Sequence, residues 1–260
     1  MNSPLTDFAE VPVVLLCGGR SVVLHAQAPA PCNKALLQLQ DKPLFWWVLQ
    51  HYVRYGGRNF ILATGIQGDA FAPALQALGA QASDSDPQVF HLTVNHHPCQ
   101  IRLLPTGAQA NTAQRLLACK PWLQAANRFA LTYSDTVSDV DLGAELAFHA
   151  REQRVATLVS AKFPVRFRVL GIRAGETTVR AFASRPVIEA ASINGGYYLF
   201  TQAIWQAQYG LEEADALENR PLEQLAQAGQ LSAFAHNGAW QNCDSERDFE
   251  CIERIVQSWA

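Results

Sequence analysis

The sequence lacks the features that would place the protein in a membrane, outside the cell or on nucleic acid. No apolar run approaches the roughly 20 residues that a membrane-spanning helix needs, and the first ten residues, MNSPLTDFAE, have neither the basic start nor the apolar stretch of a signal peptide. The 20 basic and 23 acidic residues leave a net charge of −3, without the excess of basic residues that is typical of nucleic-acid-binding proteins. We therefore expect a cytoplasmic protein with neither a membrane nor a nucleic acid as its partner.

The sequence also lacks the cysteine spacing of a zinc site. None of the six cysteines belongs to a C-x-x-C pair, and without a secretory signal reduced thiols are the simplest interpretation. Hydrophobic residues make up 49% of the chain and charged residues 17%, a balance that suits a soluble globular protein with a sizeable core. The 260 residues are enough for one large α/β domain.

Strand-like and helix-like segments alternate up to about residue 150. The apolar runs at 11–17 and 59–65 are typical of parallel strands that are buried on both faces. Further strands are expected at 88–94, 100–107 and 128–135, and helices at 43–55, 69–81, 111–123 and 140–153. This alternation predicts an α/β fold with a mostly parallel, Rossmann-like sheet flanked by helices.

The pattern changes in the second half of the chain. Short segments at hairpin spacing predict a small antiparallel insertion at about 155–200. Residues 201–230 are expected to be helical, and 232–240 to form one more strand. Because we find no internal repeat and no flexible linker, we expect residues 1–260 to form a single domain.

Four sequence blocks carry a family resemblance across nearly the whole chain. They are KALLQLQDKP (34–43), FALTYSDTVSDVD (129–141), INGGYYLF (193–200) and HNGAWQNCDSERD (236–248). In this order they resemble the segments K-x-L-L-x-V-x-x-K-P, FLxxYGDxxxDxD, INGGFFVL and HPGFWQxxDTxRD of the sugar-phosphate nucleotidyltransferase family. The resemblance is strongest to its cytidylyltransferase members.

The resemblance implies a fold, a reaction and a set of site residues. The fold is that of the nucleotide-diphospho-sugar transferases, and the reaction transfers a nucleotidyl group from a nucleoside triphosphate, CTP here, to a small sugar phosphate with release of pyrophosphate. The family is also commonly homo-oligomeric and serves nucleotide-sugar or surface-polysaccharide biosynthesis. The implied catalytic residues are Lys34, Asp135 and Asp244, of which Asp135 and Asp244 hold Mg²⁺ as the cofactor. The implied nucleotide contacts are Cys17, Gly18, Gly19, Lys34 and Arg115, and the implied substrate contacts are Arg185, Asn194 and Gly195.

The sequence departs from the family at the loop after the first strand. The family writes L-A-G-G-x-G-T-R-L, whereas this chain reads LCGGRSVVL, so that Ser21, Val22 and Val23 replace a glycine, a threonine and an arginine. A guanidinium makes bidentate contacts with phosphate and valine makes none. This departure favours an alternative function, that of a catalytically degenerate homologue that binds a nucleotide or sugar phosphate, or acts as a partner subunit.

Each candidate residue also has a purely structural interpretation. Asp135 ends a strand, where α/β sheets place ligands, or it is an aspartate of a turn or cap, with Asp139 or Asp141 as the cap of the next helix. Asp244 alone could equally cap the helix that follows. Lys34 taken alone would be a surface lysine, and Asn194 would belong to a tight hairpin turn with the two glycines after it.

A basic stretch lies within the predicted insertion. Residues 151–185 hold eight Lys or Arg and two acidic residues. These basic residues either bind phosphate ligands or lie on the solvent-exposed faces of hairpins.

Overall fold

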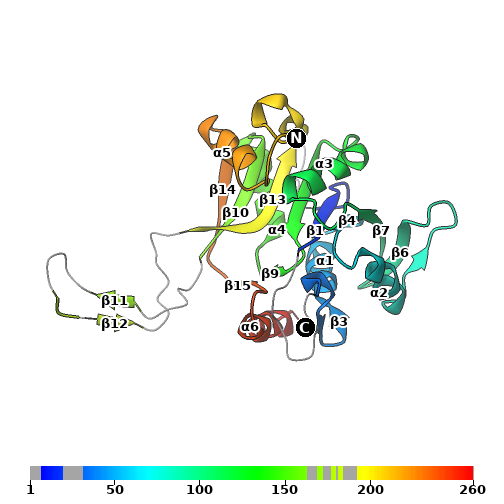
Figure 1. Cartoon of the computed structure of the whole chain (residues 1–260), viewed down its shortest axis with the longest axis horizontal. Helices are drawn as coiled ribbons and strands as arrows, with labels where there is room; N and C mark the ends of the chain where they lie inside the picture. Colours follow the sequence, from blue (N-terminus) through cyan, green and yellow to red (C-terminus); the bar gives the residue numbers. More distant parts are fainter. Residues whose placement is uncertain are drawn as a thin grey trace.

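The computed structural model describes residues 7–19, 32–162, 169–171, 177–179, 181–183 and 192–259. A nine-stranded sheet with the order β14-β10-β13-β8-β1-β4-β7-β6-β5 forms its centre (Figure 1). Only β6 and β13 run antiparallel to their neighbours, so the other seven strands of this sheet share one direction. The prediction of a mostly parallel α/β sheet is confirmed.

The elements of the described residues have the following bounds. The strands of the central sheet are β1 (Val13–Cys17), β4 (Asn59–Thr64), β5 (Gln81–Ala82), β6 (Val89–Val94), β7 (His97–Pro105), β8 (Arg128–Tyr133), β10 (Ala156–Ala161), β13 (Ile193–Thr201) and β14 (Leu231–His236). Three strand pairs lie outside it, namely β2 (Gln38–Leu39) with β3 (Lys42–Pro43), β9 (Thr136–Ser138) with β15 (Trp240–Asn242), and β11 (Val169–Gly171) with β12 (Ala181–Ala183). The helices are α1 (Leu44–Arg54), α2 (Phe71–Ala77), α3 (Thr112–Leu123), α4 (Leu142–Glu152), α5 (Arg220–Gln227) and α6 (Glu246–Gln257), and the 3₁₀ helices are η1 (Lys34–Leu36), η2 (Gly68–Ala70), η3 (Gln202–Trp205) and η4 (Ala207–Tyr209).

Apolar side chains cover both faces of the central sheet. Alternate residues of β1 enter two separate clusters, Val13 and Leu15 in one and Val14 and Leu16 in the other. Residues of α1, α2, α4 and α6 bury their apolar side chains in the first cluster, and residues of α3 and α5 in the second. Because both faces are covered, β1 needs an unbroken apolar run, which is why the sequence predicted this strand correctly.

The structure changes the bounds of the predicted antiparallel insertion and of one predicted helix. The strands β10 and β13, which fall within the predicted insertion, belong to the central sheet, whereas β11 and β12 pair with each other in a separate sheet (Figure 1). The expectation of helix throughout 201–230 is wrong for residues 210–219. Gly210 adopts a φ of +63° and ends η4, and Leu211 and Leu217 are buried without forming a helix.

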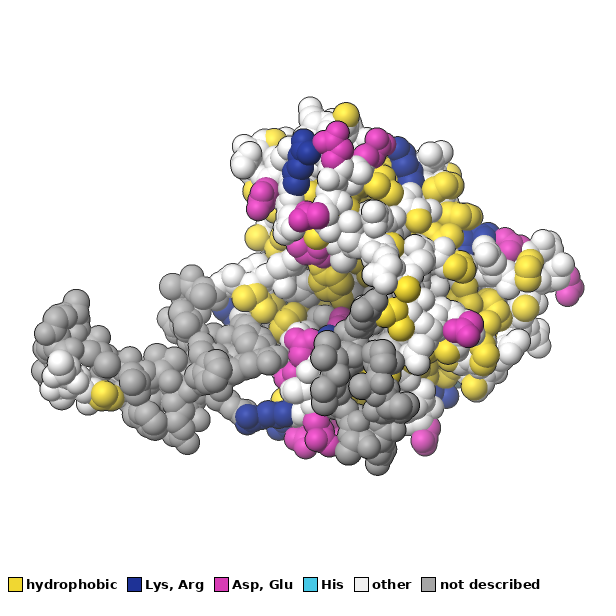
Figure 2. Space-filling model, viewed as in Figure 1, with side chains coloured by type: hydrophobic (Ala, Val, Ile, Leu, Met, Phe, Trp, Pro, Cys, Tyr) yellow, Lys and Arg dark blue, Asp and Glu magenta, His cyan; other side chains and the backbone are white. Residues whose placement is uncertain are grey.

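The surface and the thiols agree with the composition. On the face shown in Figure 2, acidic and basic side chains of the described residues are interspersed. Among the helices of the described residues, none combines the length and the apolar character that crossing a bilayer requires. All six cysteines are free thiols.

Three buried titratable groups predict how stability depends on pH. Burial raises the pKa of Glu145 from 4.5 to about 8 and lowers the pKa of His51 and of His149 from 6.5 to about 4. From pH 4.5 upward the folded state holds a proton on Glu145 that the unfolded chain releases, so stability falls as the pH rises towards 8. Below pH 6.5 the unfolded chain protonates both histidines first, so stability also falls as the pH drops towards 4.

We therefore expect maximal stability near pH 6, and we expect Glu145→Gln to remove much of the alkaline loss. Thermal melts between pH 4 and 9 test this, with a gain of roughly 5–10 °C for the variant at pH 8 and little change at pH 5. Melting curves of parent and variant that stay parallel across this range would show that Glu145 does not titrate as described.

Candidate active site

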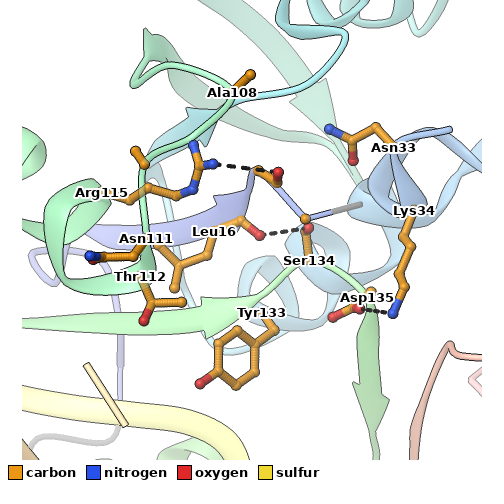
Figure 3. A pocket seen from close by; sticks show the side chains of 13 residues that line it. Leu16, Asn33, Lys34, Ala108, Asn111, Thr112, Arg115, Tyr133, Ser134 and Asp135 are labelled. Atoms are coloured by element: carbon orange, nitrogen blue, oxygen red, sulfur yellow. Dashed lines mark hydrogen bonds and ion pairs between the residues drawn. The ribbon is translucent and has the colours of Figure 1, made fainter. Parts of the chain in front are cut away.

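A cavity of about 300 Å³ opens where β1 and β8 end (Figure 3). Parallel α/β sheets place their ligands at the carboxyl ends of their strands. Arg115, Asn111 and Thr112 lie on one side of this cavity, and Lys34 and Asp135 point toward each other on the other side. The lining residues are Leu16, Gly18, Gly19, Asn33, Lys34, Ala108, Ala110, Asn111, Thr112, Arg115, Tyr133, Ser134 and Asp135.

Asn33 fixes the position of Lys34 in the fold. It is buried, and its Nδ2 donates to the carbonyl oxygens of Cys17 and Ile66, at 2.8 Å each. Its Oδ1 accepts the N–H of Ala35 at 3.0 Å and so caps η1. The segment that carries Lys34 is therefore attached to the ends of β1 and β4 by one asparagine side chain.

The pairing of β9 with β15 brings the two predicted metal ligands together. Asn242 pairs with Thr136, and the N–H of Cys243 donates to the carbonyl oxygen of Asp135 at 2.9 Å. The Lys34 ammonium lies 3.2 Å from Asp135 Oδ2 and 2.5 Å from Asp244 Oδ1. The three predicted catalytic residues therefore meet, although Lys34 and Asp244 lie 210 residues apart in sequence.

Neither aspartate caps a helix. Asp141 caps α4, because its Oδ1 accepts the N–H of Ala144 at 2.8 Å. Ser245 caps α6 through the N–H of Asp248 at 3.3 Å. The interpretation of Asp135 and Asp244 as caps is therefore wrong, whereas Asp135 does lie in a turn and the expected cap role of Asp141 is confirmed.

Neighbouring charges and burial adjust the proton affinity of Asp135 and Lys34. Burial raises the pKa of Asp135 above its ordinary value, although the Lys34 ammonium acts in the opposite direction. Burial acts to lower the pKa of Lys34, but Asp135 and Asp244 outweigh it and the net shift is upward. Lys34 is therefore held as an ammonium between two carboxyl groups, beside a cavity that is open to solvent.

Arg115 supports the loop that follows β1. Its Nη1 donates to the carbonyl oxygen of Thr64 at 3.0 Å and to Thr106 Oγ1, and its Nη2 donates to the carbonyl oxygen of Gly18 at 3.4 Å. A Cβ added at Gly18 would lie 1.8 Å from Arg115 Cζ, so only glycine leaves room for the guanidinium. Burial lowers the pKa of Arg115 below its ordinary value.

The other predicted residues of this loop take different positions. Gly19 lines the cavity, and a Cβ built on it would have no neighbour within 4 Å. The thiol of Cys17 is buried, burial raises its pKa to about 12, and its carbonyl oxygen is bound by Asn33. The Cys17 side chain therefore does not face the cavity.

The glycine pair after Asn194 accommodates its neighbours rather than forming a hairpin turn. Asn194 lies within β13, so the interpretation as a tight turn is wrong. The Trp240 indole N–H donates to the carbonyl oxygen of Gly195 at 2.7 Å, which attaches β13 to β15. Gly196 has a φ of +75°, and a Cβ there would lie 2.3 Å from the ring of Tyr133.

We expect Gly196→Ala to destabilise the protein much more than a matched glycine change. Gly79 has a φ of +91° but no atom within 4 Å of an added Cβ, so Gly79→Ala carries only the conformational penalty. We expect a loss of about 1 kcal/mol for Gly79→Ala and about 2–4 kcal/mol for Gly196→Ala, because the Tyr133 ring must also move. Urea unfolding of both variants measures the difference, and equal losses would contradict the close packing of Tyr133.

Several residues of the sequence analysis lie outside the described part of the chain. They are Arg185 and the loop residues Ser21, Val22 and Val23. Conversely, no sequence pattern predicted a role for Asn33, Tyr133 or Glu218, whose hydrogen bonds shape the site. Tyr133 could have been found from the sequence, because it lies in the same motif as Asp135. Glu218 lies in no motif that would have indicated a role.

Comparison with known proteins places the chain in a family. The glucose-1-phosphate cytidylyltransferase of Salmonella typhimurium is 32% identical over 252 residues, which cover 93% of this chain and 94% of the relative. The Bacillus subtilis protein named "Probable glucose-1-phosphate cytidylyltransferase" is 25% identical over 247 residues, with the same two coverages of 93% and 94%. The crystal structure of HddC from Yersinia pseudotuberculosis shares the fold, with a TM-score of 0.65 and 15% identity over 96% of this chain and all of that one.

No family model matches the chain. The family assignment does not need such a model. It rests on the identity and nearly full coverage of the Salmonella relative and on the shared fold. The chain belongs to the sugar-phosphate nucleotidyltransferase family.

Proposed function

We propose that the protein transfers a cytidylyl group from CTP to a sugar 1-phosphate and releases pyrophosphate. The observation that carries this proposal is the meeting of Lys34, Asp135 and Asp244 beside the cavity at the ends of β1 and β8. CTP and glucose 1-phosphate are the first substrates to test, because the Salmonella and Bacillus relatives are named for them.

The proposed reaction mainly requires charge neutralisation and alignment. An oxygen of the sugar phosphate attacks the α-phosphorus of CTP, and the bond to the β-phosphate oxygen breaks, so that its electron pair leaves with pyrophosphate. Lys34 is held as an ammonium beside the cavity, where it can neutralise charge that develops on the phosphates. Gly18 and Gly19 line the same cavity with little side-chain bulk, which lets phosphates approach the backbone.

The carboxyl groups of Asp135 and Asp244 fit a magnesium ion shared with the phosphates. Both already hold one cation, the Lys34 ammonium. Among the described residues, no group of three or more His, Cys, Asp or Glu could hold a metal. Two carboxylates completed by substrate phosphates are a common arrangement for Mg²⁺, which would be held by Asp135 and Asp244 and would reduce the charge of the phosphates.

We extend the proposal to the surroundings of the reaction. We assign Asn194 and Gly195 to the acceptor, and Trp240, whose indole N–H donates to the carbonyl oxygen of Gly195, attaches them to β15. We expect a homo-oligomer and a role in making nucleotide sugars for surface polysaccharides. Light scattering measures the first, and loss of the product nucleotide sugar in cells lacking the protein measures the second.

The experiment is a substrate matrix. Pyrophosphate release is measured for CTP, UTP, GTP, ATP and dTTP against several hexose 1-phosphates, with and without Mg²⁺, and the nucleotide sugar is identified by mass. We expect release with CTP and a hexose 1-phosphate, dependent on Mg²⁺. If no pair releases pyrophosphate while calorimetry still shows nucleotide binding, the protein is a binding homologue and the proposed reaction is wrong.

A further inference from the structure

A chain of hydrogen bonds leads from Asn194 to Glu218 and passes one wall of the cavity. Asn194 Nδ2 donates to the Tyr198 hydroxyl at 2.5 Å, and the hydroxyls of Tyr198 and Tyr133 lie 3.1 Å apart. The Tyr133 hydroxyl then donates to Glu218 Oε1. Asn194 and Tyr198 belong to β13, Tyr133 ends β8, and Glu218 precedes α5, so this relay joins three separate segments.

The donors and acceptors of the relay fit one orientation only. The N–H of Gly196 donates to Asn194 Oδ1 at 3.0 Å, which identifies Nδ2 as the donor towards Tyr198. At the other end a carboxylate can only accept, so Tyr133 donates to Glu218 and accepts from Tyr198. Each hydroxyl therefore accepts one bond and donates the next, an arrangement in which the bonds strengthen one another.

Burial keeps both phenols protonated. Burial raises the pKa of Tyr198 to about 12 and raises the pKa of Tyr133 far above its ordinary value. Both hydroxyls therefore keep the protons that the relay needs at neutral pH. Its far end is accessible, because Asn194 is exposed whereas Tyr198 is buried.

Glu218 also bonds to a second residue that lines the cavity. Its Oε2 accepts the hydroxyl of Thr112 at 2.6 Å, and the Thr112 hydroxyl accepts the N–H of Leu217 at 2.9 Å. Thr112 is the first residue of α3 and lines the cavity, as Tyr133 does. The two oxygens of one carboxyl group thus hold the hydroxyls of two lining residues from different elements.

We infer that Glu218 is a positioning residue, which through Tyr133 and Tyr198 holds the Asn194 amide so that its second N–H faces an oxygen of the acceptor substrate. The inference deepens the proposed function and rests on it, because it assigns Asn194 to the acceptor side. The chemical class that such an N–H recognises is a hydroxyl or phosphate oxygen of a sugar phosphate. Glu218 itself touches neither substrate in this scheme.

Kinetics of single-atom variants test the inference. Tyr198→Phe removes the hydroxyl in the middle of the relay and keeps the ring, so we expect the KM for glucose 1-phosphate to rise about tenfold, with the KM for CTP within about twofold of the parent. Asn194→Ala should give the same rise, and the double variant should not exceed it, since both changes break one pathway. Tyr209→Phe is the matched control, because Tyr209 is buried in the same apolar cluster as Tyr198 and lies outside the relay.

A spectroscopic measurement tests the relay without any substrate. The side-chain amide signals of Asn194 in the ¹⁵N–¹H spectrum should shift in Glu218→Gln, three hydrogen bonds away, and shift further in Tyr198→Phe. They should stay in place in Tyr209→Phe. Unchanged Asn194 signals in Glu218→Gln, with the variant folded, would overturn the relay whatever the activity of the protein.

The two proposals can fail separately. If the parent releases pyrophosphate and Tyr198→Phe leaves the KM for glucose 1-phosphate unchanged, the positioning role is wrong and the function stands. If the amide signals shift as expected but no substrate pair reacts, the proposed function is wrong and with it the acceptor-side role of Asn194, and only the relay itself remains.

Discussion

Asp135→Asn is expected to lower the rate of pyrophosphate release by at least about 10³-fold while the protein stays folded. The asparagine keeps the shape of the side chain, and the backbone bond from Cys243 to residue 135 is unaffected by the change. What it loses is one of the two negative charges that face a cation beside the cavity. Burial disfavours the charged form of Asp135, and Lys34 keeps Asp244 as its partner in the variant, so we expect the variant to fold.

The rate is measured with saturating CTP and glucose 1-phosphate over a range of Mg²⁺ concentrations, alongside a thermal melt. The control is Asp86→Asn, which removes an exposed carboxylate that pairs with Arg102 away from the cavity. We expect the control to keep the parent rate. A folded Asp135→Asn protein with a rate within tenfold of the parent would remove Asp135 from the site.

Lys34→Gln is expected to change catalysis and metal binding in opposite directions. The loss of the ammonium should lower the rate of pyrophosphate release by roughly 10²–10³-fold, because a phosphate charge is no longer neutralised. The same loss should tighten the binding of a divalent ion in the absence of nucleotide by about tenfold, because Lys34 now lies between Asp135 and Asp244 and competes for them.

Manganese, detected by electron paramagnetic resonance, reports the binding of the ion directly. Lys42→Gln is the matched control, because Lys42 lies nearby in sequence but contacts the ring of Trp46, with its Nζ 5.7 Å from the ring centre. If Lys34→Gln binds manganese no better than the parent, then the ammonium does not compete with the metal, and the pair of aspartates is not the metal site.

The sequence was sufficient to predict elements whose structure depends mainly on a short local segment. The apolar run of β1 predicted a strand buried on both faces, and the helix expected at 111–123 is α3, where the Asn111 side chain accepts the N–H of Gln114 at 2.8 Å. Lys34, Asp135 and Asp244 were found through the motifs that surround them. The sequence did not indicate that the Lys34 ammonium would lie between the two carboxyl groups, because that depends on how β15 pairs with β9.

Residues whose role depends on distant partners had no local signal. Several acidic residues precede α5, and the sequence does not distinguish Glu218 from the others. Glu218 becomes the partner of Thr112 and Tyr133 only because α3 and β8 pack beside it. Residues 210–219 were expected to be helical, but Gly210 adopts a positive φ and ends η4. The cause is therefore a set of contacts between distant segments for Glu218, and a local change of backbone direction for residues 210–219.

The order of the strands has a consequence for protein synthesis. The last strand of the central sheet, β14, ends at His236, whereas Asp244 follows β15 and comes later still. A ribosome therefore delivers every strand of that sheet before it delivers the second aspartate. A nascent chain that has already assembled its sheet still lacks half of the proposed metal site, so newly made protein would acquire activity only after Asp244 has been added.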